Sequence, residues 1–378
     1  MKTIIENLAR LREEGNLRSI RTDSSCNDST DLSTNDYLGL NDRADLREEF
    51  MNLYPVGSLA MSASASRLLA SSQKPFSTFE ATLEKYYPGK KALIFNSGYH
   101  ANTGLVSALG TKGTHIIADK LVHASIIDGI KLSNATFERF RHNDISHLDR
   151  ILSKSAASSQ RNIIIVESVY SMDGDKADIE ALVEIKERYP NTILYVDEAH
   201  AVGVEGPGGL GVCMASGKVD KVDIIVGTLG KALCSCGAFA ITSPEIREYA
   251  VNKSRSFIFS TALPPINIMW SDFIFRKALE MDTEREQLYA LGRLLGEALA
   301  SAGGRVSCSH IQPLIIGNPK DAKEFSERLA KENFTVLPIR TPTVPPGTDR
   351  LRFSLSASIN PKELVRLKNV LSNLTIHE

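Results

Sequence analysis

The chain has 378 residues, and 42% of them are hydrophobic. A chain of this length predicts two domains or one large α/β domain with an appended lobe. Its 44 basic and 45 acidic residues leave a net charge of −1, so no overall field attracts nucleic acid or an anionic membrane, and we expect neither as a partner. The 5 cysteines are an odd number, which favours reduced thiols and a cytoplasmic location.

The N-terminal segment, residues 1–21, carries Ile5, Leu8 and Leu11 at helical spacing among many charges and predicts an amphipathic helix. It lacks the uncharged apolar core of a signal peptide. No apolar run approaches the roughly 20 residues that cross a bilayer, so the expected protein is soluble. A polar link, residues 22–31, follows the helix.

The first half of the chain contains several apolar stretches that predict strands. Residues 92–95 lead into a glycine turn and the start of a helix, which presents backbone N–H groups that suit a phosphate, although an ordinary strand-to-helix turn has the same pattern. Residues 114–119 predict a short strand. Residues 162–166 form a nearly continuous apolar run, as expected of a strand covered on both faces.

The rest of the chain is organised around residues 195–237, which carry the most informative motifs. The apolar run 193–196 ends at Asp197, which predicts a buried strand with a functional carboxylate at its carboxyl end. A second run, 222–226, leads into the turn Gly-Thr-Leu-Gly that precedes Lys231. Because the neighbours of this lysine are small and apolar, we expect a lowered amine pKa and a nucleophile or Schiff-base former. The carboxylate and the amine could then hold opposite sides of one cofactor ring.

Two glycine-rich stretches do not match nucleotide-binding motifs. Residues 203–211 do not open a helix after a strand, so they are not a dinucleotide fingerprint. The turn before Lys231 is not a P-loop, because Ala232 stands where a serine or threonine would hold magnesium. Cys234 and Cys236 lack the spacing of a zinc or redox motif, and we expect both to be buried; no metal site is predicted.

Beyond Pro265 the sequence is charged and helical to about Ala302. Three strand-like segments then alternate with helical stretches, which predicts a small α+β lobe. These strand-like segments are 313–316, 335–340 and 351–357. The expected domains are an N-terminal helix and substrate-contacting segment (1–45), a large cofactor-binding domain (46–265) and a small C-terminal domain (266–378).

These motifs also carry a family resemblance. Asp197-x-x-His200 followed by Gly-Thr-Leu-Gly-Lys231-Ala resembles the core of fold-type I pyridoxal 5′-phosphate enzymes. The segments Asn35-Asp-Tyr-Leu-Gly-Leu, Asp-x-x-x-His123-Ala-Ser and Glu-Ser-Val-Tyr-Ser-Met-Asp-Gly-Asp, residues 167–175, resemble the α-oxoamine synthase branch. The resemblance spans residues 35 to 357. It implies an α/β fold with a mostly parallel sheet in the large domain and a small α+β C-terminal domain.

The resemblance implies a role for each motif residue. Lys231 would form the Schiff base with pyridoxal 5′-phosphate, and Asp197 would keep the ring nitrogen protonated, which strengthens the electron sink. His200 would lie near the phenolic oxygen and His123 against the ring face. Taken singly, such residues are more often helix caps or ordinary core side chains. The other implied cofactor contacts are Ser97, Gly98, Tyr99, Glu167, Ser171 and Thr228, together with Ser260 and Thr261 from the neighbouring subunit of a homodimer.

The implied substrate contacts are Asn35, Arg18, Ser66 and Arg352. Arg352 is preferred over Arg350 because it matches the family's arginine that follows a leucine, here Leu351, and a guanidinium suits the role because its fork binds a carboxylate in a bidentate way. A surface charge pair is the alternative for both. Arg21 could replace Arg18. Residues 61–66 contain serine and alanine where the family has glycines, so we expect a less bent loop there, and Phe76 stands where the family tends to have histidine.

The resemblance implies decarboxylative condensation of an amino acid with an acyl thioester, carried by coenzyme A or a carrier protein. The compact chain and the serine before Arg67 resemble the members that join L-alanine to a pimeloyl thioester in biotin synthesis. Acetylation of glycine is the alternative within the branch. A cofactor-free scaffold and an ordinary aminotransferase, which needs the amino acid alone, are the alternatives from other classes.

Overall fold

The computed structural model describes residues 1–18, 20, 29–71, 73–304 and 307–373; Arg21, Cys26 and most of the polar link lie outside these ranges. The chain divides into two compact units. The larger unit contains residues 40–171 and 175–282, and the smaller unit contains residues 1–39, 172–174 and 283–378. The smaller unit therefore combines the N-terminal segment with the C-terminal lobe. Its C-terminal part begins at Thr283, whereas the sequence predicted a domain boundary after residue 265.

A seven-stranded sheet in the order β2-β8-β7-β6-β5-β3-β4 forms the centre of the larger unit. Its strands from β3 to β7 are parallel, whereas β8 runs antiparallel to both of its neighbours, so the predicted mostly parallel sheet is confirmed. The strands are β2 (Lys91–Phe95), β3 (Thr114–Asp119), β4 (Thr136–Phe140), β5 (Arg161–Glu167), β6 (Thr192–Asp197), β7 (Ile224–Thr228) and β8 (Ala238–Thr242).

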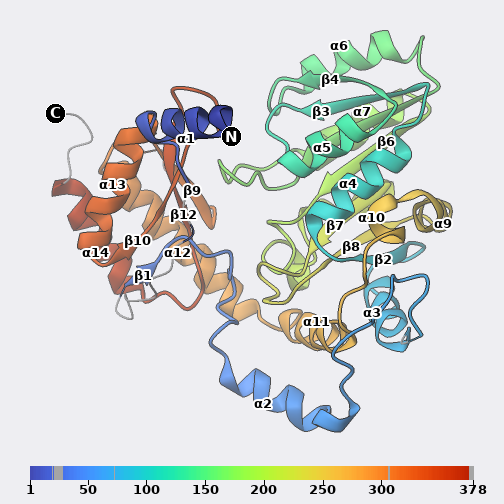
Figure 1. Cartoon of the computed structure of the whole chain (residues 1–378), viewed down its shortest axis with the longest axis horizontal. Coiled ribbons are helices and arrows are strands. Elements are labelled where there is room, and N and C mark those ends of the chain that lie inside the picture. The colour runs from blue at the N-terminus through green and yellow to red at the C-terminus, as the bar shows by residue number, and fades with distance from the viewer. Residues whose placement is uncertain (19, 21–28, 72, 305–306, 374–378) are drawn as a thin grey trace. The chain divides into compact units, whose positions relative to one another are not determined.

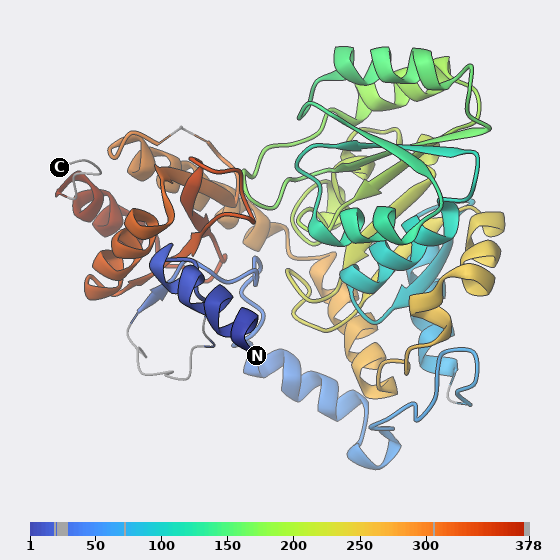
Figure 2. The ribbon, with the colours of Figure 1, turned by 45° about the horizontal axis from the view of Figure 1, so that its top comes forward.

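Helices cover both faces of this sheet (Figures 1 and 2). The chain moves outward from β2 to β4 and then back to β7, so right-handed crossovers place the first two connecting helices on one face and the next two on the other. The first pair is α4 (Gly98–Leu109) and α5 (Ala124–Leu132), and the second is α6 (Ile145–Ser155) and α7 (Ile179–Arg188). With α9 (Pro244–Lys253) and α10 (Arg255–Ile258), the first pair encloses an apolar core against the sheet.

Three neighbouring strands end side by side. In the register of the sheet, Glu167 at the end of β5 lies opposite Asp197 at the end of β6, and Asp197 lies opposite Val226 in β7. Parallel strands present their carboxyl ends at one edge, where α/β folds place their ligands. The side chains that follow these strands therefore share one location.

Seven further helices are described in the larger unit. They are α2 (Ala44–Leu53), η1 (Val56–Ser58), α3 (Lys74–Glu84), η2 (Pro207–Gly209), α8 (Val212–Ala215), η3 (Val219–Lys221) and α11 (Pro265–Ala278). Helix α3 has a core-facing stripe, since Phe79 and Leu83 are fully buried. The stripe continues to Tyr87, which is 1% exposed, and not to Tyr86, which is 37% exposed.

The smaller unit contains the predicted strand and helix alternation. Its antiparallel sheet has the order β11-β12-β9, and a short parallel pair joins β1 to β10. The N-terminal helix forms as expected, although none of its residues is buried. The elements are α1 (Lys2–Glu13), β1 (Thr30–Asp31), α12 (Asp282–Ala300), β9 (Ile311–Gly317), α13 (Pro319–Lys331), β10 (Phe334–Thr335), β11 (Leu337–Ile339), β12 (Asp349–Ser354) and α14 (Pro361–Asn373).

Two local expectations differ from the structure. Cys236 is exposed and Cys234 only partly buried, so the expected burial of this pair is wrong; both lie in the turn before β8, which begins at Ala238. In the loop of residues 61–66, which has serine and alanine where the family has glycines, Ser64 adopts a left-handed φ of 53°. This loop therefore bends without a glycine. The Oγ of Ser62 accepts hydrogen bonds from the backbone N–H (3.0 Å) and the hydroxyl (3.2 Å) of Ser64.

Candidate active site

Lys231 lies in the turn that follows β7. The turn is closed by backbone hydrogen bonds from Leu229 to Gly237 and from Ser235 to Leu229, each 2.9 Å. The apolar neighbours Leu229, Ala232 and Leu233 are at most 1% exposed, so the turn is packed into the unit while the lysine itself is partly buried. The Lys231 Nζ lies 2.7 Å from the Nε2 of His200, which follows β6. The two motif residues expected at one cofactor are thus in contact.

Asp197 is held as a buried carboxylate at the end of β6. It is 4% exposed, and its Oδ1 accepts a 2.9 Å hydrogen bond from the backbone N–H of Ala199. Its Oδ2 accepts a 2.7 Å hydrogen bond from the Nδ2 of Asn102, whose Oδ1 in turn accepts from the hydroxyl of Tyr195 at 2.7 Å. The tyrosine therefore fixes the orientation of the amide, and the amide fixes the carboxylate.

The sequence prediction missed Asn102. This amide is 2% exposed on α4, among buried residues such as Ala101, Leu105 and Val106. A buried polar side chain needs hydrogen-bond partners, so an amide on an apolar helix face was the signal that could have identified it.

His123 is connected to the same network. It precedes α5, and its Nδ1 lies 2.7 Å from the hydroxyl of Ser125, which also accepts a 2.9 Å hydrogen bond from Asn102. Burial lowers the pKa of His123, the nearby Asp197 raises it, and Lys231 lowers it further. The net decrease in pKa favours a neutral imidazole at physiological pH.

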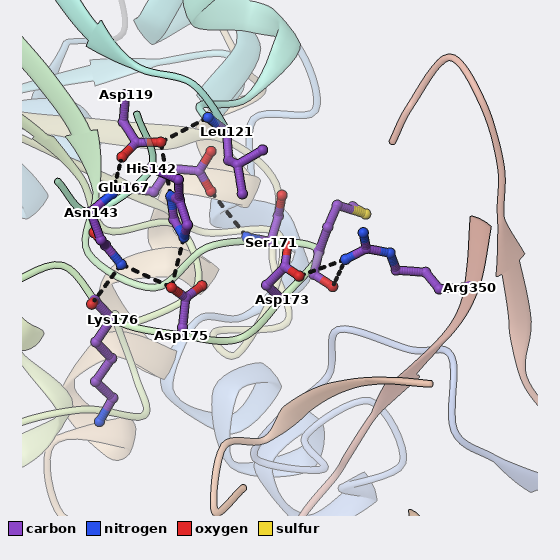
Figure 3. A network of polar contacts seen from close by, with 11 residues as sticks. Asp119, Leu121, His142, Asn143, Glu167, Ser171, Asp173, Asp175, Lys176 and Arg350 are labelled. Carbon is purple, nitrogen blue, oxygen red and sulfur yellow. Dashed lines mark hydrogen bonds and ion pairs between the residues drawn. The ribbon is translucent and has the colours of Figure 1, made fainter. Parts of the chain in front are cut away.

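Glu167 ends β5 beside Asp197 and is 2% exposed. Burial, reinforced by the negative charge of Asp197, raises the pKa of Glu167 to about 8, so its neutral form prevails at pH 7. Its Oε2 accepts a 3.2 Å hydrogen bond from the backbone N–H of Ser171 (Figure 3), whereas its buried Oε1 has no hydrogen-bond partner among the described residues. A protonated carboxyl with a buried oxygen left over is suited to contact a bound polar ligand.

Replacing Glu167 with glutamine is expected to flatten the pH dependence of stability. Because its folded pKa is raised to about 8, the folded state retains a proton that the unfolded chain releases at lower pH. Stability from this group is therefore present below the unfolded pKa and is lost as the pH rises through about 8. A glutamine is neutral throughout, so the Tm of Glu167→Gln should exceed that of the wild type by roughly 2–4 °C at pH 8.5 and match it at pH 5. Parallel Tm curves for the two proteins in thermal denaturation would contradict this assignment.

The proposed phosphate loop begins α4. The side chain of Ser97 caps this helix by accepting from the backbone N–H of His100 at 3.2 Å. A Cβ on Gly98 would lie 3.9 Å from the Oγ1 of Thr228 at the end of β7, so these two predicted cofactor contacts adjoin. The Tyr99 side chain is 47% exposed and donates its hydroxyl to Asp128 on α5. The backbone of Tyr99, but not its ring, belongs to the helix N-terminus.

Ser66, Ser260 and Thr261 lie together in the larger unit, next to Asn96, which precedes the proposed phosphate loop. Ser66 and Thr261 pair in an isolated antiparallel bridge. The carbonyl of Thr261 accepts a 2.6 Å hydrogen bond from the Nδ2 of Asn96, and Thr261 is exposed while Ser260 is partly buried. The predicted function of Ser260 and Thr261 in a neighbouring subunit stays a prediction.

The smaller unit brings two of the predicted substrate residues together. The Nη2 of Arg352 in β12 donates to the Oδ1 of Asn35 at 3.2 Å, and the hydroxyl of Tyr37 donates to the same oxygen at 3.0 Å. Burial raises the pKa of Tyr37 to about 12 against the opposing charge of Arg352, so the phenol stays neutral. Arg18, in contrast, is exposed and donates to the Oγ1 of Thr343 at 2.8 Å.

Arg350 and Arg352 have different partners. Arg350 Nη1 lies 2.6 Å from the Oδ1 of Asp173 in an ion pair (Figure 3), whereas Arg352 contacts Asn35. At 5% and 7% exposed, neither arginine belongs to a surface charge pair, so that alternative is wrong. The ion pair occupies Arg350 and supports the choice of Arg352 for a substrate carboxylate.

The described residues contain neither a metal site nor a membrane-spanning helix. No cluster of three or more histidine, cysteine or acidic side chains there has the geometry to hold a metal ion. No helix in the described ranges is both long and apolar enough to span a bilayer.

Known proteins resemble this chain over most of its length. The family described as aminotransferase class I and II matches residues 27–371. The 8-amino-7-oxononanoate synthase of Chlorobaculum parvum is 43% identical over 348 residues, which cover 91% of this chain and 88% of that protein. Serine palmitoyltransferase from S. paucimobilis, solved with a PLP-myriocin aldimine, matches with a TM-score of 0.89 and 27% identity, covering 98% of this chain and 96% of that chain. The 8-amino-7-oxononanoate synthase of Francisella tularensis matches with a TM-score of 0.77 and 28% identity, covering 92% and 97%.

Proposed function

Because this chain belongs to the aminotransferase class I and II family, and within it to the α-oxoamine synthases, we propose that it condenses L-alanine with a pimeloyl thioester to give 8-amino-7-oxononanoate, thiol and CO2. The chain is a C-acyltransferase that depends on pyridoxal 5′-phosphate. The observation that carries the chemistry is the contact between Lys231 and His200 beside the buried carboxylate of Asp197. The choice of alanine and pimelate is supported by the relatives of that name.

The residues of the larger unit fit the cofactor. The amine of Lys231 suits the aldehyde, the carboxylate of Asp197 suits the ring nitrogen, and the buried Oε1 of Glu167 is available for a polar group. The backbone at the start of α4, with Gly98 next to Thr228, suits the phosphate. When bound, pyridoxal 5′-phosphate supplies an electron sink for negative charge at the α-carbon of the amino acid.

The proton movements follow from the contacts of these side chains. Lys231 takes the α-proton of the amino acid as general base and later returns a proton to the product carbon. His200, 2.7 Å from the Lys231 Nζ, orients the amine. Asn102 and Ala199 donate to the two oxygens of Asp197 and fix its carboxylate, which would stabilise a proton on the ring nitrogen of the bound cofactor.

We propose that Arg352 binds the carboxylate of the amino acid. Its guanidinium contacts Asn35, the other residue proposed to bind the substrate, and the fork of a guanidinium matches a carboxylate in bidentate geometry. Because the carboxylate leaves as CO2, this contact positions the substrate for condensation and is lost when the product forms. Arg18, with its separate contact to Thr343, is proposed as a weaker substrate contact.

We propose a homodimer in which Ser260 and Thr261 contact the phosphate held by the partner subunit. Large apolar side chains are exposed near these residues in the chain. Phe259, which precedes Ser260, is 70% exposed, and Leu69, which follows the bridge partner Ser66 by three positions, is 79% exposed. Exposed apolar residues of this size are typical of surfaces that a second chain covers.

A panel of amino acids and thioesters tests the proposed reaction. L-Alanine, glycine and L-serine are each combined with pimeloyl-CoA, a pimeloyl-carrier protein and acetyl-CoA, and release of free thiol and CO2 is measured. The expected result is release with alanine and a pimeloyl donor that exceeds every other pair by about 100-fold or more in kcat/KM. Release with glycine and acetyl-CoA instead would replace the biotin-pathway assignment by a glycine acetyltransferase. Conversion of the cofactor to its amine form by amino acid alone would indicate an aminotransferase.

A further inference from the structure

The loop after β4 carries His142 between two carboxylates of the larger unit (Figure 3). Its Nδ1 lies 3.0 Å from the Oδ1 of Asp119, and its Nε2 lies 2.7 Å from the Oδ2 of Asp175. The ring of Tyr170 meets the imidazole edge to face at 4.4 Å. An imidazole whose two nitrogens both point at carboxylates must donate from both, which requires the charged form.

Each carboxylate belongs to a turn that carries a predicted active-site residue. Asp119 ends β3 and accepts from the backbone N–H groups of Leu121 (2.7 Å) and Asn143 (2.9 Å), so it shapes the turn that leads to His123. Asp175 follows the segment that contains Ser171 and accepts a 2.8 Å hydrogen bond from the Nδ2 of Asn143.

The segment between Ser171 and Asp175 is anchored at both ends. On one side the backbone N–H of Ser171 donates to Glu167 at 3.2 Å, and on the other Asp175 contacts His142. The residues between them, 172–174, group with the smaller unit, in which Asp173 pairs with Arg350. Glu167 therefore contacts the chain where it leaves the larger unit, at Ser171. His142 contacts the chain where it re-enters the larger unit, at Asp175.

We propose that His142 is a positioning residue whose imidazolium ties the turn that carries His123 to the segment that carries Ser171. The bond to Asp119 is the fixed half of this link, because the Asp119 side chain is fully buried. The bond to Asp175 is the other half, and the Asp175 side chain is 42% exposed. Loss of either half breaks the connection that His142 makes between Asp119 and Asp175, while the contacts of Glu167 with Ser171 and of Asn143 with Asp175 remain.

The charges around His142 support the link. Burial lowers its pKa, but the hydrogen bonds and charges of Asp119 and Asp175 outweigh burial and raise the pKa to about 10. The phenol of Tyr170 stays neutral, because burial and the nearby carboxylates raise its pKa. The stabilisation from His142 is therefore fully present below its unfolded pKa and is lost only as the pH rises through about 10.

Amide hydrogen exchange of the whole enzyme with its cofactor tests the link without any substrate. His142→Gln should raise exchange about 10-fold or more in both 119–123 and 168–177, and Asp175→Asn should raise it in 168–177. The matched control is His147→Gln, which removes a 2.9 Å contact to the backbone N–H of Arg141 in the same loop but touches neither carboxylate. Unchanged exchange in 168–177 for both His142→Gln and Asp175→Asn, or an equal increase with His147→Gln, would overturn the proposal.

Kinetics separate positioning from general stability. The catalytic consequence rests on the roles proposed for His123 and Ser171. Each single variant should lower kcat about 10-fold while KM for the amino acid changes less than about threefold, and the His142→Gln/Asp175→Asn double variant should lose no more than about 20-fold. Losses that multiply to about 100-fold in the double variant would show that the two residues act independently. If no thioester is a substrate, the exchange experiment still decides whether the link exists, so failure of the proposed function and failure of this inference are distinguishable.

Discussion

Replacing Lys231 with alanine is expected to lower kcat by roughly 10³-fold or more, because the variant loses both the covalent partner of the cofactor and the general base. The Nζ of this side chain contacts His200 at 2.7 Å. Borohydride reduction followed by mass spectrometry should add the mass of the cofactor to the peptide that contains Lys231 in the wild type and to no peptide in the variant.

Lys90→Ala is the matched control for the lysine experiment. Lys90 is also partly buried in the larger unit, where its Nζ donates to the carbonyl of Val222 at 2.5 Å and burial lowers its pKa. Its loss should reduce stability and leave the reduced cofactor adduct on Lys231 unchanged. An adduct that persists in Lys231→Ala, or that disappears in Lys90→Ala while the protein stays folded, would contradict the assignment.

Replacing Asp197 with asparagine is expected to lower kcat by roughly 10²- to 10⁴-fold while the protein stays folded. An amide cannot supply the negative charge that keeps the ring nitrogen protonated, and its NH2 group would either face the NH2 group of Asn102 or turn toward the N–H of Ala199. The same replacement should shift the visible absorption of the bound cofactor, which reports on the ring directly. Steady-state kinetics and absorption spectra measure the two effects independently.

Asp223→Asn is the control for the carboxylate. Asp223 precedes β7, where it accepts from the backbone N–H of Leu194 at 2.7 Å and pairs with Lys186 at 2.6 Å. It therefore lies near the amino end of the strand whose carboxyl end leads to Lys231. This replacement should change the Tm but leave kcat and the spectrum within about twofold of the wild type. A comparable loss of kcat in both variants would mean that Asp197 acts through the fold and not on the cofactor.

The residues that end strands were predictable because their signal is local. An apolar run that stops at Asp197, and another that leads to Lys231, reveal both the strand and the functional end of the strand. In the register of the sheet, Glu167 and Asp197 then lie opposite each other at the ends of two neighbouring parallel strands. The burial of Cys236 was predicted wrongly because residue type says little inside a turn, whose path to β8 depends on how the whole loop closes.

The amino-acid sequence by itself determined the family and the mostly parallel α/β fold, through its apolar runs and the short motifs that carry the resemblance, and it supplied the side chains proposed to contact the cofactor. Only the tertiary structure decided which side chains contact these residues. Asn102 donates to Asp197, Ser125 contacts His123, and His142 lies between Asp119 and Asp175. These contacts join residues from separate strands and helices, and a buried polar group must find its partner wherever the packed chain supplies one. A local pattern can mark a buried polar residue such as Asn102, but only the folded core decides which group it contacts.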